Sequence, residues 1–265
     1  MGISVDELEL AAAPGWRGCE EEQLGDWLLR AAEGFTGRAN SALAVGDPGI
    51  PLAEAVGKVA AWYAARGLPA LIAVPFPAGD PGSSMVDQVL ARLGWTIRAD
   101  AAIVMTAGAD EVAVRAEAEF PGGTGSSGQL QIDAEPDAHW LARYHYRGLQ
   151  QLPPVAIRVL TSAPWQAFAS VRSDGETIAI GRVAGDSRWA GLTAIEVDPR
   201  TRRRGLGAAV TAELTAHAAS RGITTIYLQV TSGNAAARAL YRRLGFADHH
   251  GYHYRVEPAR TRHGC

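Results

Sequence analysis

Cysteine and lysine are nearly missing from this sequence of 265 residues. The two cysteines, Cys19 and Cys265, are too few and too badly placed for a disulfide framework or a zinc site, so a reducing compartment is expected. Lys58 is the single lysine, and the other positive charges come from arginines. The formal net charge of -3 gives no whole-chain reason to expect nucleic acid as a partner.

Long hydrophobic runs are also missing. No stretch approaches the roughly 20 apolar residues that cross a bilayer, so no membrane partner is expected. The N-terminal stretch MGISVDELELAAAPGW is too acidic and polar for a signal peptide. A composition of 47% hydrophobic and 20% charged residues is typical of a globular protein, which we expect in the cytoplasm as a monomer or a homodimer.

The clearest break in the sequence is PGGTGSSGQ, residues 121–129. None of these side chains can anchor a core, and Gly and Ser at this density are typical of a flexible connector. The chain is long enough for two domains of ordinary size. We therefore predict one domain over residues 1–120, a linker over 121–129 and a second domain over 130–265.

Hydrophobic periodicity predicts alternating strands and helices after the linker. Residues 166–199 alternate at period two around Ser-Asp-Gly-Glu, which favours three antiparallel strands in a meander. The other predicted elements are a strand at 130–136, helices at 136–148, 208–222 and 234–244, a strand at 223–230 and a closing strand pair at 245–258.

The first half shows a related order of elements. Periodicity predicts helices at 51–67 and 83–94 on either side of a buried strand at 68–75, followed by a strand pair at 94–108. In both halves the second helix ends in Leu-Gly-aromatic, namely Leu93-Gly94-Trp95 and Leu244-Gly245-Phe246. This self-similarity predicts the duplication of one unit. Two unrelated halves that share a common helix–strand–helix pattern remain the alternative.

The segment IEVDPRTRRRGLGAAV carries the strongest chemical signal. A strand ending at Val197 runs into an arginine-rich turn, and Arg202, Gly205 and Gly207 open a helix in the pattern R-x-x-G-x-G. Unpartnered amides at a helix start, the helix dipole and nearby arginines suit a pyrophosphate. The turn lacks the Gly-Lys-Ser/Thr of a Walker loop, and Val210 fills the third glycine position of a dinucleotide fingerprint. A solvated basic loop is the alternative.

Asn234 and Tyr241 give a second signal. They are seven residues apart, or two helical turns, so they share nearly one helix face. Taken singly, Asn234 could be a helix N-cap and Tyr241 a half-buried aromatic. Their combination with the arginine turn and with Leu-Gly-aromatic favours a functional site.

At these residues the sequence resembles the GNAT superfamily of N-acetyltransferases. The resemblance covers residues 130–262 and rests on the pyrophosphate motif 202–207 and the motif 234–246. It implies an α+β fold with two GNAT-like domains, each a mixed, mostly antiparallel sheet flanked by helices, the N-terminal one partial. It also implies acetyl-CoA as the acyl donor, no metal, and an unknown primary amine on a small molecule or a protein as the acceptor.

The same resemblance assigns roles to single residues. Tyr241 would lie near the thioester sulfur as a general acid, with Asn234 on the pantetheine side. An alkylammonium of pKa about 10.4 has to lose its proton before it attacks, at a cost of roughly 4 to 5 kcal/mol at pH 7. Glu196 is the candidate base, directly or through water, and its pairing with a nearby arginine is the alternative. The predicted cofactor-binding residues are Ile195, Glu196, Val197, Arg202, Arg203, Arg204, Gly205, Leu206, Gly207, Ala208, Asn234 and Tyr241.

The first half looks like a degenerate, non-catalytic copy. Aligned on Leu-Gly-aromatic, Ser83 stands for Asn234 and Leu90 for Tyr241, and the loop with Asp47 before its long helix carries no arginine. Side chains considered for the acceptor cleft are Trp16, Arg17, Arg38, Asn40, His139, Trp140, Tyr144, His145 and Tyr146. His249, His250 and His253 lack the partners of a metal site.

Two other functions remain open on the sequence. A non-catalytic protein that binds or senses acyl-CoA would keep the arginine turn yet need no Tyr241. A nucleotide-binding α/β domain would use the same turn for another phosphate ligand.

Overall fold

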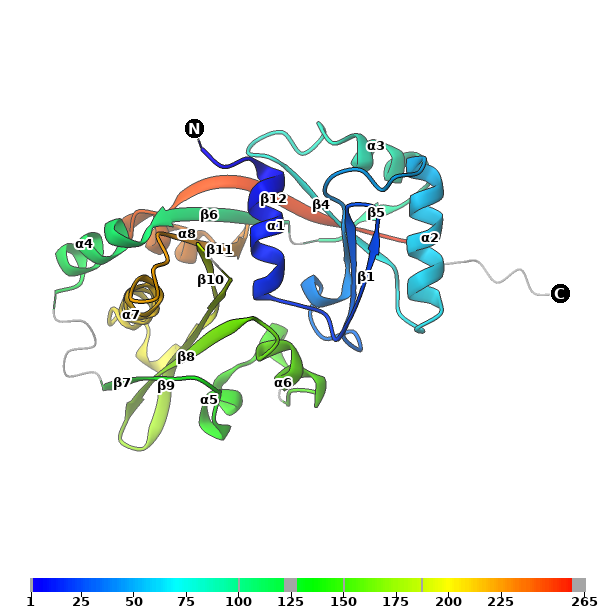
Figure 1. Cartoon of the computed structure of the whole chain (residues 1–265). Helices are drawn as coiled ribbons and strands as arrows, with labels where there is room; N and C mark the ends of the chain where they lie inside the picture. The colour runs from blue at the N-terminus through cyan, green and yellow to red at the C-terminus, as the bar shows by residue number, and fades with distance from the viewer. Residues whose placement is uncertain (1, 100, 122–127, 150, 187, 259–265) are drawn as a thin grey trace. The chain divides into compact units, whose positions relative to one another are not determined.

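The structure, a computed structural model, describes residues 2–99, 101–121, 128–149, 151–186 and 188–258 (Figure 1). Most of the predicted connector, residues 122–127, therefore lies outside the described residues. No helix among the described residues is long and apolar enough to cross a membrane.

The chain divides into two compact units, and neither is one continuous segment. The first unit consists of Met1–Leu10, Arg17–Ala102 and His250–Cys265, and the second of Ala11–Trp16 and Ile103–His249.

The second unit is a mixed sheet flanked by helices, with strand order β6-β11-β10-β9-β8-β7. β10 and β11 are parallel, whereas β7, β8, β9 and β10 are antiparallel neighbours. Its strands are β6 (Ala102–Gly108), β7 (Gln129–Asp133), β8 (Trp165–Ser173), β9 (Glu176–Gly185), β10 (Trp189–Val197), β11 (Thr225–Thr231) and the start of β12 (Ala247–Val256). Its helices are α4 (Ala109–Glu119), α5 (Ala138–Arg143), α6 (Val155–Leu160), α7 (Leu206–Ala219) and α8 (Ala235–Arg243), with 3-10 turns at Ala13–Gly15, Tyr146–Gly148 and Pro199–Thr201.

The predicted meander is confirmed by β8, β9 and β10. Asp174 (φ 50°) and Gly175 (φ 80°) make the turn between β8 and β9, and two successive positive φ angles match the twist of a tight hairpin. Helix α7 lies close against β9: a Cβ on Gly181 would stand 2.5 Å from Val210 and 2.8 Å from Leu214. Only glycine at this position lets the helix approach the sheet so closely.

The first unit is a smaller sheet in the order β1-β2-β3-β4-β12, with β5 also paired to β12. Its core contains Trp27 from β2, Val59 and Tyr63 from α2, and Leu90 from α3, all fully buried. Its elements are the first residues of α1 (Val5–Ala12), β1 (Glu20–Leu24), β2 (Trp27–Ala31), β3 (Ala42–Leu43), α2 (Leu52–Ala64), β4 (Leu71–Pro77), α3 (Met85–Arg92), β5 (Thr96–Ile97) and most of β12.

The two units differ from the two sequence halves because the halves exchange elements. β12, the last strand of the chain, pairs antiparallel with β4 in the first unit, from His250↔Pro77 to Val256↔Leu71. In return, β6 and α4, which precede the connector, belong to the second unit. The assignment of residues 1–120 and 130–265 as duplicated domains stays a prediction about origin.

The Leu-Gly-aromatic segments stop α3 and α8 in the same way. The glycine takes a left-handed conformation in both, at Gly94 (φ 80°) and Gly245 (φ 94°). The amide of the aromatic residue then donates to the carbonyl of Leu90 at 2.9 Å and of Tyr241 at 3.0 Å. The helix starts differ, because the N-cap of α3 is Ser84 and not the aligned position before it. Leu-Gly-aromatic is therefore a helix stop in both places, and the duplication inferred from it stays a prediction.

Three predicted elements differ in the structure. The closing strand pair at 245–258 is wrong, because β12 is one continuous strand; Gly251 lies against the ring of Phe76, 2.4 Å from where its Cβ would stand, and makes no turn. β5 pairs with β12, so the predicted pair at 94–108 is not a hairpin of its own. The helix at 136–148 ends at Arg143, because the next free amide, that of His145, donates to a side chain of β10.

Candidate active site

A bulge in β10 separates it from β11. Between Thr193 and Glu196, β10 advances three residues while β9 advances two, from Arg182 to Ile180, and Ala194 takes a φ of 53°. β10 pairs with β11 only as far as Leu192 within the described residues. Beyond that point no described strand pairs with the β11 side of β10.

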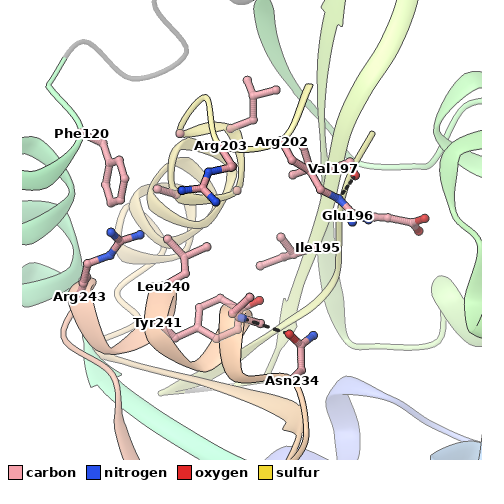
Figure 2. A pocket seen from close by; sticks show the side chains of 16 residues that line it. Phe120, Ile195, Glu196, Val197, Arg202, Arg203, Asn234, Leu240, Tyr241 and Arg243 are labelled. Carbon is pink, nitrogen blue, oxygen red and sulfur yellow. Dashed lines mark hydrogen bonds between the residues drawn. The ribbon is translucent and has the colours of Figure 1, made fainter. Parts of the chain in front are cut away.

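A cavity of about 680 Å³ opens beside this end of β10 (Figure 2). Its walls come from β10, the start of α7, helix α8 and the end of α4. The lining residues are Phe120, Ile195, Glu196, Val197, Arg202, Arg203, Gly205, Leu206, Gly207, Ala208, Asn234, Ala236, Ala237, Leu240, Tyr241 and Arg243. All of the predicted cofactor residues are therefore brought together except Arg204, which is exposed and not among these walls.

The start of α7 presents bare amides to the cavity. Gly205 caps the helix in a left-handed conformation (φ 79°) and has no side chain to accept from the first amides. The amides of Leu206 to Ala208 precede the first helical bond, which Ala209 makes to the Gly205 carbonyl at 2.9 Å. A Cβ on Gly207 would stand 3.3 Å from Leu240, so a larger residue would crowd α8. This arrangement suits an anion.

Asn234 and Tyr241 line the cavity and also fill the structural roles that the sequence left open. Asn234 is the N-cap of α8, because its side-chain oxygen accepts from the Ala237 amide at 3.1 Å. Tyr241 is buried, with its ring edge-on to Phe246 at 5.8 Å. Burial raises the pKa of Tyr241 to about 12, above the value of about 10 expected from its type. Its hydroxyl makes no hydrogen bond within the described part of the chain.

Among the described residues, Glu196 pairs with a histidine, and no arginine there makes an ion pair with it. Its carboxylate accepts from the His145 amide at 2.9 Å and lies 3.1 Å from Nδ1 of the same imidazole. Figure 2 shows Glu196 extending away from Tyr241 and Asn234. A carboxylate placed in this way acts on a distant proton only through its imidazole partner or through water.

Comparisons with known proteins show the family of the chain. The sequence matches the family described as "Probable histone acetyltransferase Rv0428c C-terminal" over residues 4–255. The chain belongs to this family. An "Uncharacterized N-acetyltransferase YobR" of Bacillus subtilis is 26% identical over 262 residues, covering 96% of this chain and 98% of the relative.

A second relative and a solved structure are similar over nearly the whole chain. The "Probable histone acetyltransferase Rv0428c" of Mycobacterium tuberculosis is 29% identical over 270 residues, covering 97% of this chain and 75% of the relative. A "GCN5-related N-acetyltransferase from Kribbella flavida" superposes with a TM-score of 0.69 and 21% identity, covering 98% of this chain and 97% of that chain. The protein is thus an acetyltransferase of the GNAT type, with the predicted class of fold.

A second cavity of this acetyltransferase, of about 320 Å³, is lined by His145, whose hydrogen-bond partner Glu196 lines the first cavity. Besides His145 its polar walls include His139, Arg143, Glu176 and Arg200. The nearly buried Asp198, also in this wall, accepts from Arg143 at 2.7 Å and from the Arg200 amide at 2.8 Å.

The Arg200 guanidinium, helped by its own amide and by Arg143, holds the pKa of Asp198 far below its usual value. Asp198 therefore remains a carboxylate. It anchors the beginning of the arginine turn, because it is the N-cap of the 3-10 turn Pro199–Thr201.

The other side chains considered for the acceptor cleft divide between core and loop. Trp140 is core, since its indole donates to the carbonyls of Ala169 at 3.1 Å and Gly181 at 3.2 Å, and Tyr144 is buried beside it. Tyr146 is half-buried. None of these three side chains lines either cavity.

The four residues proposed from the first half line neither cavity. Asn40 is buried and holds a loop of the first unit, accepting from the amides of Ala32 and Gly34. Trp16 is buried in the second unit beneath the Arg182 guanidinium, 5.1 Å from its ring centre. Arg17 pairs with Glu21, and Arg38 begins a 3-10 turn.

Two of the three histidines of β12, His250 and His253, lie against carboxylates in the first unit. His250 is fully buried 2.8 Å from Glu9, and His253 lies against Asp87. Among the described residues there is no group of three or more His, Cys, Asp and Glu side chains that could hold a metal ion.

Sequence reasoning missed five residues that line the cavity. Leu240, Ala236 and Ala237 lie on the same face of α8 as Tyr241, so helical spacing could have found them. Arg243 follows in the next turn. Phe120 precedes the connector and carries no local signal that ties it to the site.

Proposed function

We propose that this acetyltransferase uses acetyl-CoA and transfers the acetyl group to a primary amine, by direct attack of the amine within a ternary complex. The observation that carries the proposal is the cavity itself. It joins the bare amides of α7 and the arginines Arg202 and Arg203 at one end to the buried hydroxyl of Tyr241 at the other. Few ligands need an anion site and a proton donor so placed, and coenzyme A with its thioester is one.

In this proposal the amides of Leu206 to Ala208 receive the pyrophosphate, with Arg202 and Arg203 adding charge-assisted contacts. The open backbone edge of Ile195 to Val197 hydrogen-bonds the pantetheine arm in place of β11. Asn234, whose oxygen is used as a cap, offers its amide nitrogen as a donor. Tyr241 donates to the sulfur as it leaves.

Removal of the amine proton is assigned to His145 held by Glu196. The imidazole lines the second cavity, where an amine can enter, and its Nδ1 lies against the carboxylate. An imidazole whose Nδ1–H is fixed by a carboxylate has Nε2 free to take a proton, the arrangement of base and orienting group found in hydrolase triads. Glu196 is then a positioning residue and His145 the base.

Substitution of this pair is expected to produce a loss that depends on pH. Glu196→Gln and His145→Asn should each lower kcat at least about tenfold at pH 7. The loss should shrink toward pH 10, because an amine of pKa about 10.4 is then increasingly neutral without help. Steady-state rates from pH 6 to 10 test this. A deficit that stays constant over that range, or one confined to KM for acetyl-CoA, contradicts the base assignment.

Substitutions in the arginine turn test whether acetyl-CoA is the acyl donor. Isothermal calorimetry of acetyl-CoA with the double variant Arg202→Gln/Arg203→Gln should show an affinity at least about tenfold weaker than wild type, since each arginine lost removes a charge-assisted contact. Arg204→Gln is the control for the effect of charge alone: it removes one positive charge, against two in the double variant, from the same turn outside the cavity.

Three outcomes would count against this donor site. If the intact protein does not bind acetyl-CoA, the proposed function is wrong. If the double variant and the control lose the same affinity for acetyl-CoA, the arginines act only through the overall positive charge of the turn. Tighter binding of ATP or NAD than of acetyl-CoA favours the nucleotide-binding alternative.

A further inference from the structure

The donor cavity has an aromatic wall that comes from before the connector. Phe120 is the C-cap of α4 and half-buried, and it lines the same cavity as the arginine turn. Its Cδ1 stands 3.6 Å from the place where a Cβ of Gly205 would be, so the ring abuts the bare helix start. Figure 2 shows Phe120 on the opposite side of the cavity from Asn234.

An arginine accompanies this ring. The guanidinium carbon of Arg243 lies 5.3 Å from the centre of the Phe120 ring, within the range of a cation–π contact. Arg243 makes no ion pair within the described part of the chain, whereas Arg238 and Arg242, on the same helix, share Asp248 at 2.8 and 2.7 Å. Arg243 is thus the arginine of α8 whose charge no carboxylate balances there.

These features favour a ligand with a flat base and a phosphate. An exposed aromatic face stacks on nucleobases of any kind, and a guanidinium binds phosphate through paired N–H donors. Both groups adjoin the turn assigned to the pyrophosphate, at the end of the cavity away from Asn234. In coenzyme A, the group next to the pyrophosphate is an adenosine that carries a 3′-phosphate.

We propose that Phe120 and Arg243 form a subsite for the nucleotide end of coenzyme A, with the adenine against the Phe120 ring and the 3′-phosphate at Arg243. The inference rests on the proposed function. It gives the sequence before the connector a part in donor binding. With this subsite, the enzyme would bind an acyl-CoA more tightly than an acyl group carried on phosphopantetheine alone.

Truncated ligands separate the two contacts. Calorimetry with CoA, dephospho-CoA and 4′-phosphopantetheine is run on wild type, Arg243→Gln and Phe120→Leu. Arg243→Gln should weaken CoA about tenfold or more and leave dephospho-CoA within about twofold. Phe120→Leu should weaken CoA and dephospho-CoA about fivefold or more and leave 4′-phosphopantetheine within about twofold.

Two further variants guard against a purely structural effect. Phe120→Tyr keeps the ring face and should bind all three ligands as wild type does. Arg242→Gln is the matched control, because it removes the neighbouring arginine, whose partner is Asp248, and it should change none of the affinities more than about twofold.

The subsite is overturned if Arg243→Gln weakens CoA and dephospho-CoA by the same factor. It is also overturned if Phe120→Leu weakens 4′-phosphopantetheine as much as CoA, which is the result expected of a pair that only holds α4 to α8. Failure of the proposed function looks different, because the wild-type protein would then bind none of the three ligands.

Discussion

Tyr241→Phe is expected to lower kcat by about 100- to 1,000-fold while changing the affinity for acetyl-CoA less than about threefold. The variant removes only the hydroxyl. The ring keeps its edge-on contact with Phe246, so α8 remains packed as before. Steady-state kinetics combined with calorimetry measures both quantities on the same preparation.

The raised pKa of Tyr241 sharpens this prediction. A phenol of pKa about 12 is a weaker acid than a thiol of pKa about 8.5 by more than three pKa units, or about 5 kcal/mol, so it does not by itself protonate a free thiolate. Its contribution comes from a hydrogen bond to the sulfur while the C–S bond breaks. The departing thiolate then takes the proton that the attacking nitrogen loses as the amide forms, and Tyr241 keeps its own. Because the hydroxyl stays protonated to about pH 11, kcat should show no alkaline decline from this residue below pH 10.

Three outcomes of this experiment can be told apart. A variant that keeps more than about a third of the wild-type kcat contradicts the role of the hydroxyl. An alkaline decline below pH 10 that disappears in Tyr241→Phe contradicts its raised pKa. If neither protein turns over while both bind acetyl-CoA equally, the acyl-CoA sensing alternative describes the protein better.

The parts of the site that the sequence predicted are those with a local cause. The helix start at Gly205, the N-cap at Asn234 and the spacing of Asn234 and Tyr241 on α8 all depend on residues within two helical turns of each other. The same holds for the turn at Asp174 and Gly175, which places β8 beside β9. Such features are fixed by backbone preferences that a single sequence displays.

The parts that were missed depend on partners far away in the sequence. Gly251 resembles a turn residue, and only the ring of Phe76 explains it as a strand glycine. The helix predicted through residue 148 ends early because Glu196, 51 residues on, accepts the amide of His145. Phe120 joins the cavity because α4 packs in the second unit, which local periodicity cannot show.

A buried cluster of charged side chains joins β12 to α3 in the first unit. Arg255 of β12 donates to both carboxylate oxygens of Asp87 on α3, at 2.8 and 2.7 Å, and to the Trp95 carbonyl at 2.8 Å. The imidazole of His253 lies 2.5 Å from the same carboxylate. Asp87 and Arg255 are 8% exposed and His253 3%. In a charge cluster so well shielded from water, removing one charge leaves the others buried without a partner and destabilises the fold.

Asp87→Asn is therefore expected to lower the free energy of unfolding by about 3–5 kcal/mol, because it leaves Arg255 buried without a charged partner. Urea unfolding followed by tryptophan fluorescence measures the loss. Glu54→Gln is the matched control: it breaks the ion pair of Glu54 with Lys58, both 54% exposed, and should cost less than about 0.5 kcal/mol.

The loss of stability at acid pH should also differ between wild type and Asp87→Asn. Burial by itself raises the pKa of Asp87, but the hydrogen bonds and charges of Arg255 and His253 lower it more, so it ends below its usual value. A carboxylate with a lowered folded-state pKa contributes stability that is present above its unfolded pKa of about 3.9 and is lost as pH falls through the folded pKa. Between pH 5 and pH 2, wild type should therefore lose more stability than Asp87→Asn.

A paired replacement tests whether the unbalanced charge is the cause. If the cost of Asp87→Asn arises from a buried guanidinium without a partner, then removing both charges in Asp87→Leu/Arg255→Met should recover most of the loss, since apolar side chains of similar size replace buried ion pairs at little cost. If the double variant is instead as unstable as Asp87→Asn, the hydrogen bond from Arg255 to the Trp95 carbonyl and the packing of its stem hold β12 to α3. The electrostatic account of the cluster would then be wrong.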